Sequence, residues 1–94
     1  MKLTIVNGAD ESRRFELEDG ELYDLGRGSQ TTIRLRDSFV SRVHARLSVH
    51  ACEVMVHDWG SSSGITVNGD KVSEAILNTG DIVKMGNTEL QYEE

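Results

Sequence analysis

The chain has 94 residues, a hydrophobic fraction of 37% and a net charge of −6 at pH 7. This length corresponds to about one small domain, so we expect residues 1–94 to form a single unit. The negative charge argues against nucleic-acid binding, and no apolar stretch reaches the roughly 18 residues of a membrane span. Cys52 is the only cysteine, which excludes an internal disulfide and, with no secretory leader in evidence, favours the reducing cytoplasm.

Short strands are predicted along the whole chain, because apolar and polar residues alternate in many brief segments. In Arg42–His50 this period of two places Val43, Ala45, Leu47 and Val49 on one side, toward a core. The other segments of this kind are, in chain order, Leu3–Ile5, Phe15–Leu17, Leu22–Leu25, Thr32–Arg36, Val54–Asp58, Ile65–Val67 and Leu90–Tyr92.

Turn signals separate the predicted strands. Asn7-Gly8, Asp19-Gly20 and Asn68-Gly69 tolerate positive φ, as tight turns require. Asp19-Gly20 lies between two strand-like segments and predicts a hairpin joining Phe15–Leu17 to Leu22–Tyr23. No segment carries an apolar helical stripe with caps at both ends. Many short strands with closely spaced turns predict an all-β sandwich of roughly ten strands.

Positive charge is concentrated in one segment. Residues 27–46 contain five arginines (Arg27, Arg34, Arg36, Arg42 and Arg46) and one acid, Asp37, so this segment carries +4 and the rest of the chain −10. The planar guanidinium fork suits phosphate and carboxylate groups. By composition alone, a phosphate-binding segment and a solvated basic face are equally good interpretations.

Three polar clusters interrupt the strand pattern. They are Gly26–Ser29, Ser41–His44 and the serine run Ser61–Ser63, which Gly64 follows. The loops of a sandwich gather at the two ends of its sheets, where a rigid scaffold presents them. An arginine and two serine hydroxyls that meet there would form a receptor for a phosphate, which carries about −1.5 to −2 charge and three acceptor oxygens.

These motifs together resemble the forkhead-associated (FHA) domain. The likeness rests on Gly26-Arg27, on Ser41–His44 and on the segment from Asp58 to Gly69, in that order, and it extends from Leu3 to Tyr92. The resemblance implies an FHA/SMAD-like β-sandwich of eleven mostly antiparallel strands. It also implies a signalling module that recognises phosphothreonine in a partner protein marked by a Ser/Thr kinase, with no catalysis, cofactor or metal.

The resemblance assigns roles residue by residue. Arg27, Ser41 and Ser62 stand at the family's phosphate-binding positions, and Arg42 stands where a side chain often contacts the peptide near the phosphate. Structural positions of the family motif correspond to Gly26, His44, Gly64, Asn68 and Gly69. The small residue lets its loop turn, and the imidazole is expected to hold neighbouring loops together by hydrogen bonds.

The chain departs from the family pattern at two positions. Ser63 stands where the family usually has an Asn that hydrogen-bonds the peptide main chain, and Ile65 replaces the usual Thr. Serine is shorter and lacks the amide's paired donor and acceptor. We therefore expect an intact phosphate anchor and a weakened grip on the peptide main chain, with Ser63 still among the peptide-binding residues.

Simpler interpretations stand beside these roles. Arg27 could pair with Asp24 or Glu21 on the surface, Ser41 could merely satisfy a turn, and Ser62 and Ser63 could be flexible loop filler. A further alternative function is an FHA-like scaffold that binds unphosphorylated partners or self-associates. The chain could also be one domain of a larger protein.

An enzyme interpretation is weak. Gly60–Gly64 fits G-x-S-x-G, but that motif requires a following helix within a large parallel sheet. Ser41, His44 and Asp58 are the residue types of a catalytic triad, but nothing in their spacing predicts that they meet in the geometry that a triad requires. His50, Cys52 and His57 are too few for a closed zinc site.

Overall fold

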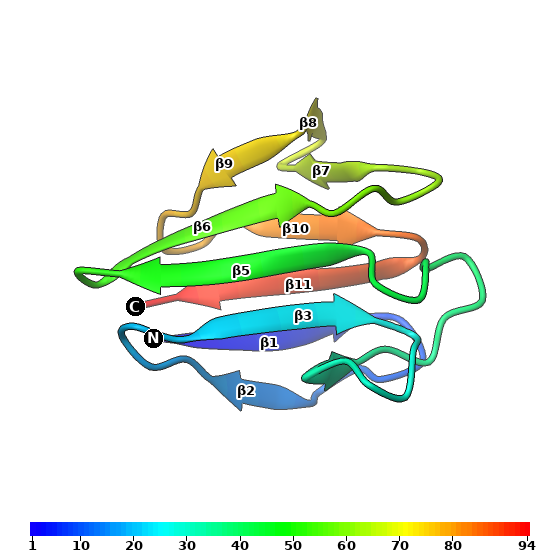
Figure 1. The fold of residues 1–94 in the computed structure, drawn as a ribbon, viewed down its shortest axis with the longest axis horizontal. Coiled ribbons are helices and arrows are strands. Elements are labelled where there is room, and N and C mark those ends of the chain that lie inside the picture. Colours follow the sequence, from blue (N-terminus) through cyan, green and yellow to red (C-terminus); the bar gives the residue numbers. More distant parts are fainter.

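The computed structural model describes all 94 residues and contains eleven strands in two sheets (Figure 1). The all-β sandwich that the sequence predicts is therefore confirmed. In chain order the strands are β1 (Lys2–Asn7), β2 (Arg14–Glu16), β3 (Leu22–Gly26), β4 (Ile33–Arg34), β5 (Ala45–His50), β6 (Glu53–Asp58), β7 (Ile65–Val67), β8 (Asp70–Val72), β9 (Glu74–Ile76), β10 (Ile82–Met85) and β11 (Thr88–Glu93).

The two sheets have simple strand orders. The six-stranded sheet runs β2-β1-β11-β10-β7-β8, and the five-stranded sheet runs β4-β3-β5-β6-β9. Neighbouring strands pair antiparallel in both sheets, except β3 and β4, which are parallel. The structure offers no helix with the length and apolar composition that crossing a membrane requires.

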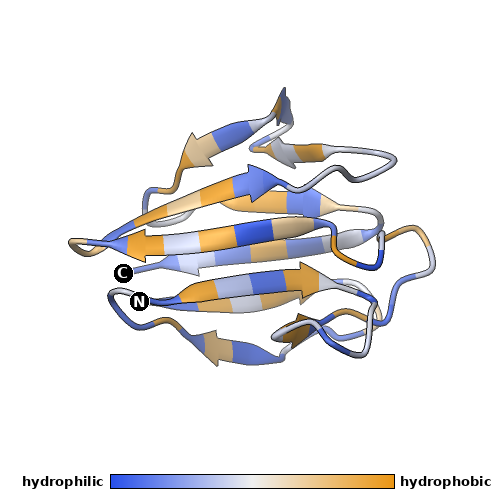
Figure 2. Cartoon of the chain, viewed as in Figure 1, coloured by the Kyte–Doolittle hydropathy of each residue, from blue (hydrophilic) through white to orange (hydrophobic).

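The core lies between the sheets and consists of eighteen buried apolar residues. Alternation along the strands places them there, as the orange bands of β5 and β6 show in Figure 2. Leu3, Ile5, Leu90 and Tyr92 come from the paired strands β1 and β11 and are at most 1% exposed. Burying a large apolar side chain contributes about 1.5–3 kcal/mol, so each of these four positions stabilises the fold.

The predicted hairpin at Asp19-Gly20 is wrong. A turn is present there, with Gly20 at φ +85°. However, β2 pairs with β1 in one sheet, while β3 pairs with β4 and β5 in the other. The buried Leu17 marks the crossing from the first sheet to the second. The turn is held instead by a hydrogen bond of 2.8 Å from the Gly20 N–H to the Val49 carbonyl.

Two predicted strands are shorter than expected. The segment Arg42–His50 becomes a strand only at Ala45, and Val43 is 37% exposed rather than in the core. Its first residues instead cross the end of β3, where the Gly28 N–H donates to the Arg42 carbonyl at 3.0 Å. The segment Thr32–Arg36 is a strand only over Ile33–Arg34, although it does bury its apolar residues.

Several connections gather at one end of the sandwich, at the right in Figure 1. They are the β1–β2, β3–β4, β4–β5, β6–β7 and β10–β11 connections, and the β3–β4, β4–β5 and β6–β7 connections carry the three polar clusters. The two termini lie at the other end. We call the end at which these connections gather the loop end.

Candidate functional site

The loop end carries an open hollow of about 560 Å³. Two cations and several hydroxyl groups face it, and no Asp or Glu is among its lining residues, although the whole chain carries −6. The walls come from four loops and two strands, with these residues: Arg27, Ser38, Phe39, Val40, Ser41, Ser62, Ser63, Gly64, Thr66, Lys84, Gly86 and Asn87.

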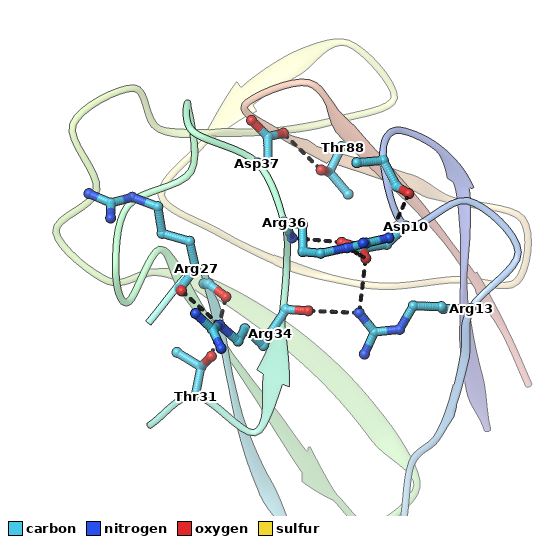
Figure 3. Close-up of polar contacts among 10 residues, drawn as sticks. Asp10, Arg13, Arg27, Thr31, Arg34, Arg36, Asp37 and Thr88 are labelled. Atoms are coloured by element: carbon cyan, nitrogen blue, oxygen red, sulfur yellow. Dashed lines mark hydrogen bonds and ion pairs between the residues drawn. The ribbon is translucent and has the colours of Figure 1, made fainter. Parts of the chain in front are cut away.

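Arg27 is fixed at its backbone and free at its guanidinium. Its N–H donates to the Ser41 carbonyl at 3.1 Å, and its carbonyl accepts from Nε of Arg34 at 3.1 Å. The side chain forms no ion pair and extends away from this cluster (Figure 3). Of the two proposed surface partners, Asp24 instead pairs with Arg46 at 2.8 Å. The guanidinium is therefore available to a ligand.

The backbone around Arg27 is held by close packing. Gly26 lies directly against the Arg42 carbonyl, where a side chain would overlap backbone atoms, and a Cβ on Gly28 would approach the same oxygen to 3.0 Å. The Thr31 hydroxyl donates to the Gly28 carbonyl at 2.7 Å. The need for glycine at Gly26 thus follows from this approach and not from an unusual φ, because its φ is not positive.

Ser41 and Ser62 meet across two loops. The Ser62 N–H donates to Oγ of Ser41 at 3.2 Å, and their two hydroxyl oxygens are 3.4 Å apart. Both side chains line the hollow together with Arg27. The three residues are far apart in sequence, and the structure brings them to one place.

His44 joins the loop that contains Ser41 to the loop that contains Ser62. Its ring is fully buried; Nδ1 accepts from the Ser41 N–H at 3.0 Å, and Nε2 lies 2.7 Å from the Gly64 carbonyl. A carbonyl only accepts, so Nε2 carries the proton, and the neutral ring satisfies both loops. The imidazole therefore sets the relative positions of Ser41 and the serine run.

The serine run divides into a brace and a binding face. Oγ of Ser61 donates to the Asp58 carboxylate at 2.5 Å and accepts from the Gly64 N–H at 2.8 Å. Ser62 and Ser63 are exposed and face the hollow. Ser61 thus holds the loop shape, which leaves the next two side chains for a ligand.

Sequence reasoning missed Asp37, which had only been counted as the one acid in a basic segment. Its carboxylate accepts from the Phe39 N–H at 2.9 Å, the Asn87 N–H at 2.7 Å and the Thr88 hydroxyl at 2.8 Å. Burial alone would raise the pKa of Asp37, but these three bonds outweigh it and hold that pKa below its ordinary value. Asp37 thereby ties the segment before Ser41 to the β10–β11 turn.

A second acid, Asp10, anchors the same region from the β1–β2 connection. It is 3% exposed and accepts from the backbone and Nε of Arg36 at 2.6 and 2.7 Å, while Arg13 lies 3.2 Å away (Figure 3). Burial would raise the pKa of Asp10, but the bonds from Arg36 and Arg13 lower it overall. Arg36 and Arg34 are therefore structural, and the basic segment is divided between fold and site.

The remaining assigned residues lie around or away from the hollow. The Arg42 side chain is exposed and is not among the lining residues, so only its backbone takes part in the site's architecture. Asn68-Gly69 forms the β7–β8 turn with both residues at positive φ. The Asn68 amide donates to Asp81 at 2.9 Å, a contact that supports this turn.

The structure provides no catalytic constellation. The His44 ring bonds to the backbone of Ser41 and to Gly64, while the Asp58 carboxylate bonds to Ser61, so the triad is not assembled. Strand β7, not a helix, follows Gly60–Gly64. No group of three His, Cys, Asp or Glu side chains is arranged to hold a metal ion.

Comparisons with known proteins point to one family. The family model "Inner membrane component of T3SS, cytoplasmic domain" matches residues 4–94. The glycogen accumulation regulator GarA of Mycolicibacterium smegmatis is 36% identical over 90 residues, which cover 96% of this chain. The chain spans 56% of the length of GarA and 15% of the length of FhaA, an FHA domain-containing protein of Mycobacterium tuberculosis to which it is 33% identical.

Solved structures agree over nearly the whole chain. The FhaA FHA domain, crystallised with the intracellular domain of Rv3910, has a TM-score of 0.86 and 31% identity, and the match covers 96% of both chains. A structure described as "Structural and functional analysis of phosphothreonine-dependent FHA domain interactions" has a TM-score of 0.89 and 30% identity, covering 99% of this chain and 94% of the other.

Proposed function

Because this chain belongs to the forkhead-associated family, we propose that it binds a phosphothreonine segment of a partner protein at the loop end. FHA domains are non-catalytic binding modules. Arg27, Ser41 and Ser62 form the receptor for the phosphate in this proposal, and the acid-free hollow that they share is the observation that carries it.

Charge supports a phosphate as the ligand of the hollow. A phosphoryl group on threonine carries about −1.5 to −2 charge at pH 7 and three acceptor oxygens. The Arg27 guanidinium supplies several donors, and the Ser41 and Ser62 hydroxyls supply one each. Charge-assisted hydrogen bonds of this kind are roughly twice as strong as neutral ones.

Preorganisation supports binding without rearrangement. The Arg27 backbone, the Ser41 backbone and the serine loop are each held by hydrogen bonds that use no group facing the hollow. A receptor whose loops are already ordered loses little conformational entropy when the ligand arrives. An extended peptide docking over these loops, by arginine and hydroxyl recognition, is a known binding mode.

Arg27→Ala tests the receptor. We expect a loss of about 2–3 kcal/mol in binding free energy, which corresponds to roughly a hundredfold weaker affinity for a phosphothreonine peptide. Titration calorimetry measures the affinity, and circular dichroism checks the fold. Arg14→Ala is the matched control, since Arg14 is exposed on β2, outside the hollow. Equal affinities of the two variants would refute the assignment.

Wider features of the proposal concern the whole protein. We propose that residues 1–94 act as one domain in the cytoplasm and that a Ser/Thr kinase marks the partner segment. Ser63 would contact the peptide beside the phosphate from the wall of the hollow, and the exposed Arg42 side chain would contact it from outside the hollow.

A scaffold function is favoured by one separate observation. Leu22, Met55 and Ile76 lie in one cross-strand row on the outer face of the five-stranded sheet, with Ser48 between Leu22 and Met55, and Leu22 and Ile76 are 59% and 48% exposed. Such a row suits contact with an unphosphorylated partner or a second copy. Phosphatase treatment of the partner separates the candidates, because only a phosphate-dependent complex dissociates.

A further inference from the structure

The hollow at the loop end continues onto the outer face of the six-stranded sheet. Thr66 of β7 and Lys84 of β10 line this hollow, and both also line a second one of about 410 Å³ beside Asn68 and Ile82. An extended chain that leaves the phosphate receptor therefore has a continuous track across β7 and β10. The chemistry of that track determines which flanking residues it accepts.

Two lysines flank Thr66 along this track. Lys71 on β8 and Lys84 on β10 are the register partners of Thr66 on its two sides. Partners in antiparallel strands have Cα atoms about 4.5–5.5 Å apart and share a face of the sheet. The Lys71 side chain also lies over Gly64, since a Cβ there would be 3.5 Å from Nζ of Lys71. Lys71 lines neither hollow, but its ammonium group therefore lies near Gly64, which lines the first.

Neither lysine forms an ion pair within the protein. Glu89 is the register partner of Lys84 on β11 and also lines the second hollow, but its carboxylate accepts a hydrogen bond of 2.9 Å from Asn7. No carboxylate lies within 4.0 Å of the ammonium group of Lys71 or Lys84. Two cations without an ion-pair partner therefore lie on either side of Thr66. An anion could bind both ammonium groups and the Thr66 hydroxyl.

Protection of a sheet edge explains only half of this arrangement. Lysine on an edge strand opposes unwanted pairing with another chain, and β8 is an edge strand of the six-stranded sheet. Strand β10 lies inside the sheet, between β11 and β7, so Lys84 has no edge to protect. Because Lys84 lines both hollows and forms no ion pair, its ammonium group is available to a ligand.

We propose that Lys84 and Lys71 form a second anion subsite, which binds an acidic or phosphorylated side chain flanking the phosphothreonine of the same peptide. This inference rests on the proposed function, because the subsite adjoins the phosphate receptor and acts on a peptide already anchored there. The subsite makes the module selective for segments that carry a second negative group at one spacing from the phosphothreonine.

The test compares three phosphothreonine peptides that differ at one flanking position, which holds Ala, Glu or a second phosphothreonine and is moved along the peptide. At the matching position we expect Glu to strengthen binding about threefold to fivefold over Ala, and phosphothreonine by more. The variant Lys84→Met should remove this advantage, whereas Arg27→Ala should weaken binding of all three peptides. A gain for phosphothreonine alone would identify the ligand as a doubly phosphorylated segment.

Controls separate this subsite from general charge. Lys2→Met removes the same charge at the start of β1, five residues from the end of that strand at the loop end, and should keep the preference for Glu. The preference should also weaken with added salt, because exposed ion pairs are screened. A wild type that binds the Ala peptide without preferring an anion anywhere would overturn the subsite alone. Equal weakening of all three peptides by Lys84→Met would also overturn it, and failure of every phosphopeptide to bind would overturn the proposed function as well.

Discussion

At the scale of single residues, the site depends on side chains that no ligand would touch. His44 hydrogen-bonds to backbone groups, and the Ser61 hydroxyl hydrogen-bonds to Asp58. These bonds hold the loops in which the Ser41 and Ser62 side chains line the hollow. A buried polar group that loses its partner costs about 1–3 kcal/mol. Substitutions at these supporting positions should therefore reduce both stability and binding.

Asp37 gives the sharpest test of such support. In Asp37→Asn the amide can no longer accept all three hydrogen bonds, from Phe39, Asn87 and Thr88. We expect unfolding free energy to fall by about 1–3 kcal/mol and phosphopeptide affinity to fall with it, because the loop before Ser41 loosens. Urea denaturation and calorimetry measure the two effects.

A matched variant is available at the other end of the molecule. Asp19 accepts one exposed hydrogen bond, from the Cys52 N–H at 3.1 Å. Asp19→Asn should leave affinity unchanged and change stability by less than about 0.5 kcal/mol. If Asp37→Asn behaved like Asp19→Asn, the proposed link between the carboxylate and the binding loop would be wrong.

Ser63 is the position where a substitution should improve binding. It lines the hollow, is exposed and makes no hydrogen bond within the protein, so its replacement disturbs nothing else. Ser63→Asn restores the longer side chain with a donor and an acceptor. One added hydrogen bond is worth about 0.5–1.5 kcal/mol, or roughly twofold to tenfold in affinity for the phosphopeptide. Weaker binding in calorimetry would indicate that the serine serves a different contact.

At the scale of elements, the loop end is organised by the crossing of two backbones. The segment Ser41–His44 passes over the end of β3, where the Arg27 N–H, the Gly28 N–H and the Leu25 carbonyl all bond to it. This crossing, together with the Gly26 contact, places Arg27 next to Ser41 even though fourteen positions separate them in the numbering. The proposed phosphate receptor is thus a consequence of how β3 and β5 meet.

Gly26→Ala tests the crossing. The new methyl group would overlap the Arg42 and Ser41 carbonyl groups, which are backbone and cannot swing away. We expect a loss of about 3 kcal/mol or more in stability, measured by thermal and urea unfolding. Gly80→Ala is the control: its φ of +94° makes a side chain strained, but nothing lies within 4 Å, so its cost should be only about 1–2 kcal/mol. A smaller loss for Gly26→Ala than for Gly80→Ala would contradict this packing argument.

The same elements show what a sequence can predict. Alternation identified β1, β5, β6 and β11 because each has one face in the core, and burial enforces a period of two. Turn chemistry failed at Asp19-Gly20, because a glycine-containing turn reports a local φ and not which sheet the next strand joins.

Local pattern reached only part of the site. Arg27, Ser41 and Ser62 were found through motif resemblance. Asp37 and Lys84 do not stand out in the sequence, since the contacts that place them beside the hollow are with residues distant in sequence, such as Thr88 and Thr66. An acid within a basic segment, at Asp37, was the one signal that could have suggested a bracing role.

At the scale of the whole molecule, acid should affect folding and binding in separate ranges of pH. Asp10 and Asp37 have pKa values below the ordinary 3.8 in the folded state. A lowered folded pKa means that the unfolded chain binds protons first, so both carboxylates stabilise the fold fully above about pH 5. That contribution is lost as pH falls through about 4 and toward the folded values.

The phosphate of the proposed phosphothreonine ligand titrates at higher pH, with a second pKa of about 6. Between about pH 6.5 and 5 the dianion becomes a monoanion, which weakens its bonds to Arg27 while the fold is still intact. We therefore expect phosphopeptide affinity to fall severalfold in a range where near-ultraviolet circular dichroism is unchanged, and stability to decline only at lower pH. A peptide carrying a phosphate mimic with a lower second pKa should keep its affinity through that first range. If both peptides lost affinity together, the change would lie in the protein, and the ligand's charge would not be what the loop end recognises.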